Sequence, residues 1–132
     1  MIVVDACVWV ELLTNDGKLG DWAREQVDTA DHCLVSEHTR LEVANLIQAR
    51  YLRGELTERR GRDAVELLGH FEMDVVPFQH VLGRIWELRS TVTAYNAAYV
   101  AIAEQHQCPL VTVDIKLAAT PGPGCEFRCP PF

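Results

Sequence analysis

Four polar side chains of this 132-residue chain stand among apolar neighbours, and their types suggest metal-dependent chemistry. Asp5 closes the apolar run MIVVD, and Asp114 closes PLVTVD. Glu42 and Asn96 each lie in a helix-like segment whose neighbouring positions are largely apolar. Oxygen ligands of this kind, with no set of His or Cys ligands nearby, favour Mg²⁺ or Mn²⁺ over Zn²⁺. Such an ion commonly orients a water for attack on a phosphodiester and stabilises the leaving oxygen.

The charges of Asp5, Glu42 and Asp114 would require a cation or a proton if the three side chains meet. Two carboxylates about 5 Å apart repel each other by roughly 3 kcal/mol at an effective dielectric constant near 20. Three such pairs would cost on the order of 10 kcal/mol, which is comparable with the whole stability of a domain. A shared divalent ion is the simplest way to offset this repulsion.

Strand-like and helix-like segments alternate along the chain, which predicts a parallel sheet covered by helices on both faces. The expected strands are 2–4, 33–35, 73–76 and 110–113, with a weak edge strand at 126–128. The expected helices are 7–13, 18–29, 38–53, 57–70, 79–90 and 94–106, with one helical turn at 115–119. Ser36 and Thr57 are expected to cap the helices that follow them, and Gly54 to end a helix. With no internal repeat or linker, residues 1–132 are predicted to form one three-layer α/β/α domain with a mostly parallel sheet of four to five strands.

This topology predicts that the four polar residues meet at one edge of the sheet. Ligands of open parallel sheets bind beyond the carboxyl ends of the strands, and Asp5 and Asp114 both follow a strand at that edge. Glu42 lies in the early turns of the helix that leaves the second strand. Asn96 begins the helix that runs into strand 110–113, so it is expected at the same edge.

Each acid also has a purely structural interpretation. Asp5 could cap the helix that follows the first strand, and Asp114 could cap the turn that begins at Ile115. Glu42 could be an exposed surface acid. The placement of all three at one edge favours a shared site over three separate explanations.

Composition narrows the class of protein. The chain is 48% hydrophobic and 23% charged, and no apolar run is long enough to span a membrane. The first residues form a strand and not a signal segment, so we expect a cytoplasmic protein. Three of the five cysteines, Cys7, Cys33 and Cys108, are expected to be reduced thiols near the core. Cys125 and Cys129 lack the further ligands that a structural zinc site needs.

The charge distribution leaves two interpretations open. A net charge of −7 argues against broad, non-specific affinity for nucleic acid. Five arginines nevertheless cluster on one helix–turn–helix segment, namely Arg50, Arg53, Arg59, Arg60 and Arg62. They form either a solvated surface or a contact for phosphate or an acidic partner. Trp9, Trp22 and Trp86 are expected mostly in the core, with the remainder on a dimer face or a partner groove.

Taken together, these segments resemble the PIN-domain nucleases, most closely the VapC-type toxins of bacterial toxin–antitoxin pairs. The matching segments are MIVVDACVWVELL, SEHTRLEVANLI, TAYNAAYVAIAE and LVTVDIKLA. The resemblance implies a PIN-like α/β/α fold and an endoribonuclease that uses Mg²⁺ or Mn²⁺ on structured RNA, often tRNA or rRNA. It also implies a homodimer and a cognate antitoxin whose C-terminal segment fills the active-site groove. An acidic groove would attract an Arg or Lys side chain from that partner.

By position, the resemblance implies a catalytic set of Asp5, Glu42, Asn96 and Asp114, of which Asp5, Asn96 and Asp114 would hold the metal. Thr112 matches a polar position often found beside these acids, although its β-branched side chain also suits a strand. The family expects an acid where this chain has Asn96, and a small hydroxyl residue is common where it has Cys7. An Asn can offer a neutral oxygen to a metal or its water, but it cannot supply the charge.

Two explanations of Asn96 remain open. The residue could be a deliberate Asp-to-Asn change that inactivates a toxic nuclease, which the otherwise intact motif favours. Alternatively, the natural protein could be weakly active, or a PIN-like module that binds RNA or an antitoxin-like partner without cutting. A phosphoryl-transfer domain of the dehalogenase type also places an acid after its first strand. It usually needs a second acid where this chain has Cys7, and no Gly-rich phosphate loop is present.

Overall fold

Five short parallel strands form the centre of the molecule, in the order β3-β2-β1-β4-β5. This computed structural model describes all residues from 1 to 132. The strands are β1 (Ile2–Val4), β2 (Cys33–Ser36), β3 (Asp74–Val76), β4 (Leu110–Val111) and β5 (Phe127–Arg128). The predicted α/β fold is therefore confirmed, and the sheet is parallel throughout. All five carboxyl ends lie at one edge, which is where side chains that follow the strands can meet.

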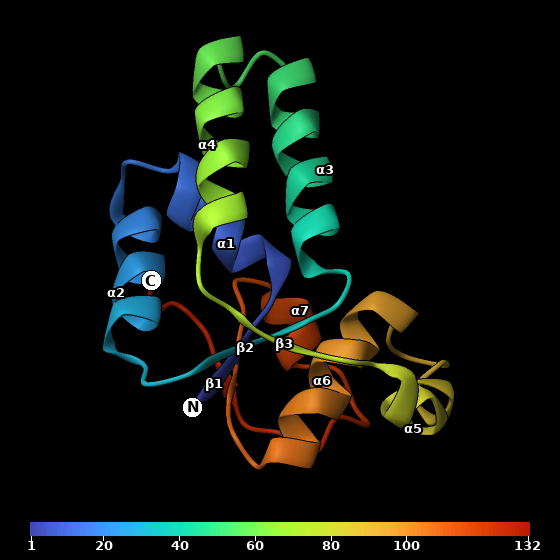
Figure 1. Ribbon diagram of the computed structural model, residues 1–132. Coiled ribbons are helices and arrows are strands. Elements are labelled where there is room, and N and C mark those ends of the chain that lie inside the picture. Colours follow the sequence, from blue (N-terminus) through green and yellow to red (C-terminus); the bar gives the residue numbers. More distant parts are fainter.

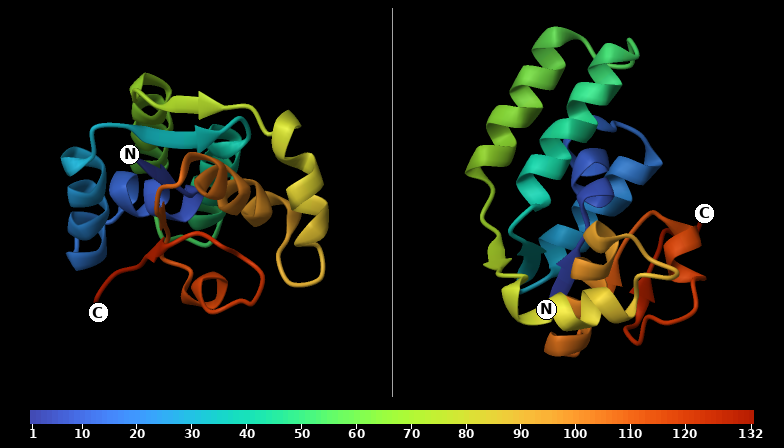
Figure 2. Two further views of the ribbon diagram at one scale, coloured as in Figure 1. Left: turned by 90° about the horizontal axis from the view of Figure 1, so that it is seen from below. Right: turned by 90° about the vertical axis from the view of Figure 1, so that its right-hand side faces the viewer.

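Helices pack on both sides of this sheet (Figures 1 and 2). The helices are α1 (Ala6–Thr14), α2 (Lys18–Thr29), α3 (Thr39–Leu52), α4 (Glu58–His70), α5 (Leu82–Glu87), α6 (Ala94–His106) and α7 (Ile115–Ala118). Helix α1 contacts α2, α3 and α4, and α3 contacts α4, while α6 packs against β1, β2, β4 and α5. The paired α3 and α4 extend away from the sheet, so α3 runs from the sheet edge to a distant tip (Figure 1). No helix is long and apolar enough to cross a membrane.

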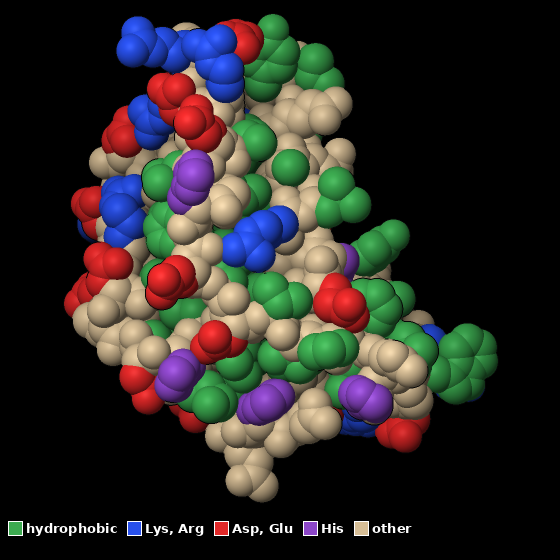
Figure 3. Space-filling model, in the orientation of Figure 1, with side chains coloured by type: hydrophobic (Ala, Val, Ile, Leu, Met, Phe, Trp, Pro, Cys, Tyr) green, Lys and Arg blue, Asp and Glu red, His purple; other side chains and the backbone are tan.

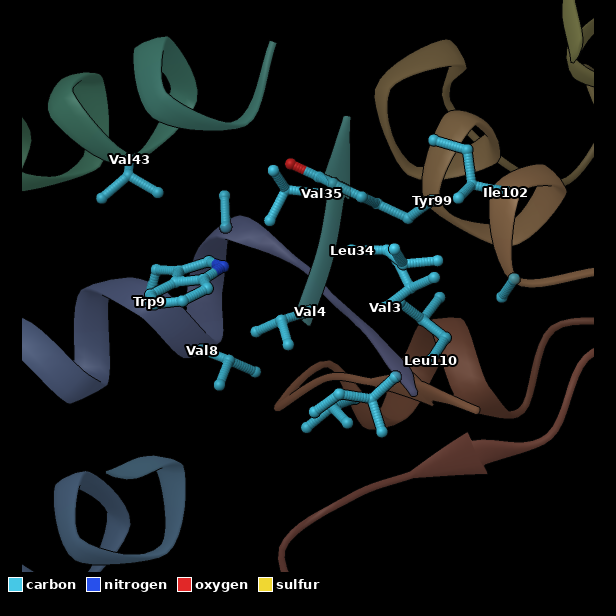
Figure 4. Packing of buried hydrophobic residues seen from close by; sticks show 14 of the residues in the cluster. Val3, Val4, Val8, Trp9, Leu34, Val35, Val43, Tyr99, Ile102 and Leu110 are labelled. Carbon is cyan, nitrogen blue, oxygen red and sulfur yellow. The ribbon is translucent and has the colours of Figure 1, made fainter. Parts of the chain in front are cut away.

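The core follows from the alternation of side chains along each strand. Figure 4 shows Val4 with Val8 and Trp9 on one side of β1, and Val3 with Ile102 on the other. All five of these side chains are completely buried. Because consecutive strand residues point to opposite faces, a short apolar strand can supply both layers of the core.

Local signals set several helix ends. The Thr57 hydroxyl accepts a hydrogen bond from Arg60 N at 3.1 Å, which confirms Thr57 as the cap of α4. Gly54 has φ of +79°, a conformation that favours glycine, directly after the cap of α3. The edge strand expected near the C-terminus is confirmed as β5, which pairs with β4.

Three local predictions were wrong. Ser36 does not cap α3: it is the last residue of β2, and His38 occupies the cap position without a side-chain hydrogen bond. The helix expected at 79–90 is a 3₁₀ turn (Gln79–Val81) followed by α5, which ends at Glu87, where Arg89 N bonds to Trp86 O three residues back. Strand β4 stops at Val111, because the Thr112 hydroxyl accepts Asp114 N and turns the chain.

Candidate active site

The carboxyl edge of the sheet carries all four predicted site residues. Asp5 directly follows β1, and Asp114 lies three residues beyond β4. Glu42 is in the first turn of α3, and Asn96 is in the first turn of α6. Asp5 is linked to the backbone of Asp114 through Cys7 and Thr112, and Glu42 and Asn96 line the same cleft.

Asp5 is a carboxylate held in the core, with 3% of its surface exposed. Its Oδ1 atom accepts hydrogen bonds from the backbone N and the thiol of Cys7, so Asp5 does cap α1. Burial raises the pKa of Asp5, and hydrogen bonds from Cys7 and Thr112 lower it only in part. A buried carboxylate whose ionised form is disfavoured would be stabilised by a nearby cation.

Asp114 is joined to Asp5 by a short chain of contacts. The Cys7 thiol bonds to Asp5 and lies 3.6 Å from the Thr112 hydroxyl, which accepts Asp114 N at 3.0 Å. Asp114 Oδ1 accepts Lys116 N and Leu117 N, and so caps α7. The capping interpretation therefore holds for both acids. Each cap uses a single carboxylate oxygen, which leaves the second oxygen for another ligand.

Glu42 is held by side chains that the sequence did not single out. The Tyr99 hydroxyl donates to Glu42 Oε1 at 3.1 Å, and His38 Nε2 lies 3.3 Å from the same oxygen. Burial raises the pKa of Tyr99, and the negative charges of Glu42 and Asp5 raise it further. Tyr99 therefore stays protonated and lies within the field of both acids, one on each side of the site.

Asn96 opens onto a cleft shared with Glu42. The cleft has a volume of about 690 Å³, and its walls are His38, Leu41, Glu42, Asn45, Thr93, Tyr95 and Asn96. The backbone N of Asn96 is bonded to the α6 cap Thr93, while its side-chain amide makes no hydrogen bond within the protein. The amide is therefore available to a ligand in the cleft.

The donor set suits a hard cation that keeps part of its water shell. No three acids, histidines or cysteines gather closely enough to form a complete cage. Mg²⁺ is usually held by one or two carboxylates, with water and substrate phosphates in the other positions. Asp5 and Asp114, with the amide oxygen of Asn96, fit that pattern. Burial raises the pKa of the Cys129 thiol, and the negative charges of Asp5 and Asp114 raise it further.

The arginine cluster lies at the other end of α3. Figure 3 shows basic side chains gathered over the outer end of α4. Each of the five arginines is paired with an acid: Arg50 with Glu11, Arg53 with Glu55, Arg59 with Asp63, Arg60 with Asp16, and Arg62 with Glu58. These pairs favour the solvated-surface interpretation over a free phosphate-binding patch.

Sequence reasoning missed the neutral donors around the acids. Tyr99 lies three residues after Asn96, and His38 lies four residues before Glu42, so each shares a helix face with a predicted site residue. This spacing was the available signal. Thr39 could not be recognised from the sequence, because its hydroxyl donates a hydrogen bond to Tyr99, which is sixty positions away.

Comparison with known proteins decides the family. Residues 2–123 match the PIN domain family. Ribonuclease VapC9 of Mycobacterium tuberculosis is 33% identical over 131 residues, which cover 99% of both chains. The chain belongs to the VapC ribonuclease toxins of the PIN-domain family. VapC1 of the same organism is also 33% identical, over 96% of this chain and 95% of its own length.

Solved structures support the VapC fold. VapC20 of M. tuberculosis, described as a toxin that cleaves the sarcin–ricin loop, aligns over 90% of this chain and 94% of its own, with a TM-score of 0.70 at 16% identity. VapBC2 of Rickettsia felis, solved with a promoter DNA fragment, aligns over 98% of both chains with a TM-score of 0.68 at 12% identity. At these identities the likeness concerns the fold alone.

Proposed function

We propose that this VapC family member is built to hydrolyse phosphodiester bonds of structured RNA with Mg²⁺ or Mn²⁺. The observation that carries the proposal is the connection of Asp5, a desolvated acid with a raised pKa, to Asp114 through Cys7 and Thr112. A neutral cap such as Ser or Asn would serve α1 equally well, without the cost of a buried carboxylate. The cleft beside Glu42 and Asn96 gives the RNA a place to bind.

The residues would divide the work by position. Asp5, Asp114 and the Asn96 amide oxygen would hold the ion. Bound there, the ion would neutralise phosphate charge and lower the pKa of a water. Glu42, in the wall of the cleft, would orient that water and accept its proton. Lys116 is exposed two residues beyond Asp114 and forms no ion pair, so it can contact an RNA phosphate.

Asn96 would leave this chain poorly active. A carboxylate at position 96 would supply a negative charge that the amide lacks. A unit charge at about 4 Å is worth about 4 kcal/mol at an effective dielectric constant near 20, before the double charge of the ion is considered. The missing charge therefore weakens the hold on the metal, while the rest of the site keeps its shape.

The test is the Asn96→Asp variant, compared with the present chain on tRNA and rRNA. Cleavage with Mn²⁺ should rise by about 100-fold or more, because an interaction of about 4 kcal/mol exceeds the roughly 2.8 kcal/mol that such a factor requires. Expression of the variant should also slow bacterial growth. A variant that leaves both RNA classes intact and growth unchanged would refute the nuclease function. The double variant Asn96→Asp/Asp5→Asn is the matched inactive control.

An antitoxin is proposed as the physiological inhibitor. The acids at the sheet edge are bonded to neutral groups, so an Arg or Lys from a partner could replace the cation and offset their repulsion. Changing the groove-facing Arg of the cognate antitoxin to Ala should weaken the complex, as measured by calorimetry. Unchanged affinity would count against this mode of inhibition.

A homodimer is proposed from an apolar face next to the site. Leu41, Leu82, Trp86 and Tyr95 are 77%, 52%, 67% and 66% exposed. They come from the start of α3, from α5 and from the start of α6, and Figure 3 shows apolar side chains over this right-hand side. Exposed apolar patches of this kind mark protein interfaces. Sedimentation should give a dimer for the parent chain and a monomer for Trp86→Asp, and a dimeric variant would contradict this interface.

The competing function is a PIN-like module that binds RNA or an antitoxin-like partner without cutting. Asn96 is the observation that favours it, since the position lacks the expected charge. It predicts partner binding with no metal-dependent turnover even in the Asn96→Asp variant. In either case we place the protein in the cytoplasm, where tRNA and rRNA are found.

A further inference from the structure

A chain of hydrogen bonds runs from the backbone of β2 to Glu42 and delivers a proton donor to one carboxylate oxygen. Ser36 N donates to Thr39 Oγ1 at 3.0 Å. Thr39 Oγ1 donates to the Tyr99 hydroxyl at 3.2 Å, and that hydroxyl donates to Glu42 Oε1 at 3.1 Å. Ser36, Thr39 and Tyr99 are almost completely buried, so no water competes for these bonds.

The direction of this chain is fixed by its two ends. Ser36 N can only donate, so the Thr39 hydroxyl accepts from it, and the Glu42 carboxylate can only accept, so Tyr99 donates to Glu42. The single proton of Tyr99 is therefore used on Glu42, and Tyr99 must accept the proton of Thr39. Burial raises the pKa of Tyr99, which keeps the phenol protonated beside the two acids. Every hydroxyl proton in the chain therefore points towards the active site.

The chain holds only one side of the Glu42 carboxylate. Oε1 receives Tyr99 and lies near His38 Nε2, whereas Oε2 has no hydrogen bond within the protein. Glu42 also lines the cleft. A free glutamate side chain rotates about three bonds, and fixing one oxygen restricts where the other can lie.

We propose that Thr39 and Tyr99 are positioning residues that fix Glu42 Oε1, so that Oε2 is presented to the water or RNA in the cleft. This inference rests on the proposed nuclease function. Thr39 and Tyr99 touch neither substrate nor metal and act only through Glu42. A partner one step removed from a metal site commonly changes activity or metal affinity by about 10- to 100-fold when it is lost.

The kinetic experiment uses the Asn96→Asp chain as its parent, with RNA cleavage as the readout. Adding Tyr99→Phe or Thr39→Val should lower kcat by about 10- to 100-fold with KM unchanged. Adding Thr39→Ser should keep the parent kcat, because serine retains the hydroxyl. Adding Tyr51→Phe is the matched control. It removes a tyrosine hydroxyl near the end of α3 that has no hydrogen bond within the protein, and it should change neither kcat nor KM. An unchanged kcat in Tyr99→Phe, or equal losses in Thr39→Ser and Thr39→Val, would overturn the proposal.

A second measurement needs neither metal nor turnover and uses the present chain. A buried, hydrogen-bonded hydroxyl proton exchanges slowly with water, so Tyr99 should give an NMR resonance that is absent in Tyr99→Phe. Glu42→Gln should shift this resonance, because a neutral acceptor binds the proton more weakly. A resonance that Glu42→Gln leaves in place would refute the proposal. An inactive Asn96→Asp parent would refute the nuclease function alone, and the NMR result would still decide whether Tyr99 holds Glu42.

Discussion

Charged side chains at the two ends of α3 have different kinds of partner. At the distal tip, Arg50 and Arg53 each lie against an acid, as do the three arginines of α4. At the sheet edge, Glu42 is bonded to the neutral phenol of Tyr99, and Asp5 to the neutral thiol and backbone N of Cys7. The same helix therefore joins a region of neutralised charge to a region where negative charge is left over.

This difference distinguishes charged residues that stabilise the fold from charged residues that are available to a ligand. Ion pairs at the tip are satisfied within the chain and hold segments together, so they need no ligand. The acids at the sheet edge have polar neighbours but no Lys or Arg partner, and burial already disfavours the ionised form of Asp5. Charge that the fold does not neutralise is therefore where we propose that a cation binds.

The pair of Glu11 and Arg50 is the strongest test of the neutralised end, because Glu11 is 8% and Arg50 27% exposed. Glu11→Ala should lower the free energy of unfolding by about 3 kcal/mol or more, since it leaves the guanidinium without its counter-charge. The loss is read from urea denaturation. The double variant Glu11→Leu/Arg50→Met should recover most of it. A loss in Glu11→Ala below about 1 kcal/mol would show that this pair behaves as an ordinary surface pair.

Metal binding should stabilise the folded protein through the acids at the sheet edge and not through the ion pairs at the tip. In the Asn96→Asp chain, Mn²⁺ at about 100 times its Kd should raise the free energy of unfolding by about 2.7 kcal/mol. Adding Asp5→Asn or Asp114→Asn should abolish most of this gain, because the ion loses a ligand. Arg60→Ala should keep it. Thermal unfolding with and without EDTA measures the effect, and an equal gain in Asp5→Asn would place the metal elsewhere.

The pair of Glu104 and Arg84, which lies away from both ends of α3, predicts how stability depends on pH. Its carboxylate accepts two hydrogen bonds from the guanidinium of Arg84, at 2.8 and 3.0 Å. These bonds are the main reason that the pKa of Glu104 lies below its ordinary value of 4.5. The unfolded chain therefore takes up the proton first as the pH falls. The stabilisation is complete above about pH 4.5 and is lost as the pH falls through the folded pKa.

Glu104→Gln should consequently cost about 1–2 kcal/mol at neutral pH and reduce the loss of stability at acid pH. Urea denaturation at several values between about pH 3 and pH 7 gives both results. If the variant and the parent lose stability in parallel below about pH 4.5, other carboxylates control the acid limb.

The smallest effect is expected at Arg60 and Asp16, which form two hydrogen bonds on the surface of the tip. Their side chains are 39% and 79% exposed, so solvent screens the pair. Arg60→Ala should cost about 0.2–1 kcal/mol, and the cost should shrink further in high salt. A cost as large as that of Glu11→Ala would remove the distinction between the buried and the exposed arginines of this cluster.

Sequence patterns located the strands and most helix ends because these depend on residues close together in the chain. Apolar runs marked the strands, Thr57 marked the start of α4, and Gly54 marked the end of α3. Ser36 was misassigned for the same reason: a serine before a helix has the local signal of a cap. The Thr39 hydroxyl instead bonds to Ser36 N and keeps Ser36 in the strand.

The sheet edge that carries the candidate site residues was also predictable, but the contacts of their side chains were not. The rule for parallel sheets places Asp5 and Asp114 together once the strands are known. It says nothing about Cys7 and Thr112, which link the two acids across 105 positions of sequence. A helix expected at 79–90 ended early at Glu87, and no local pattern announced that change.

The order of apolar runs and polar residues by itself determined a parallel α/β fold with acids at its carboxyl edge, because side-chain periodicity and strand direction are properties of the local chain. Only the tertiary structure decided which oxygen of each acid is already bonded. Tyr99 meets Glu42 across 57 positions, and such a contact depends on how two helices pack against one sheet. Packing of distant segments, and not local preference, determined which charges of this protein are neutralised and which are left for a ligand.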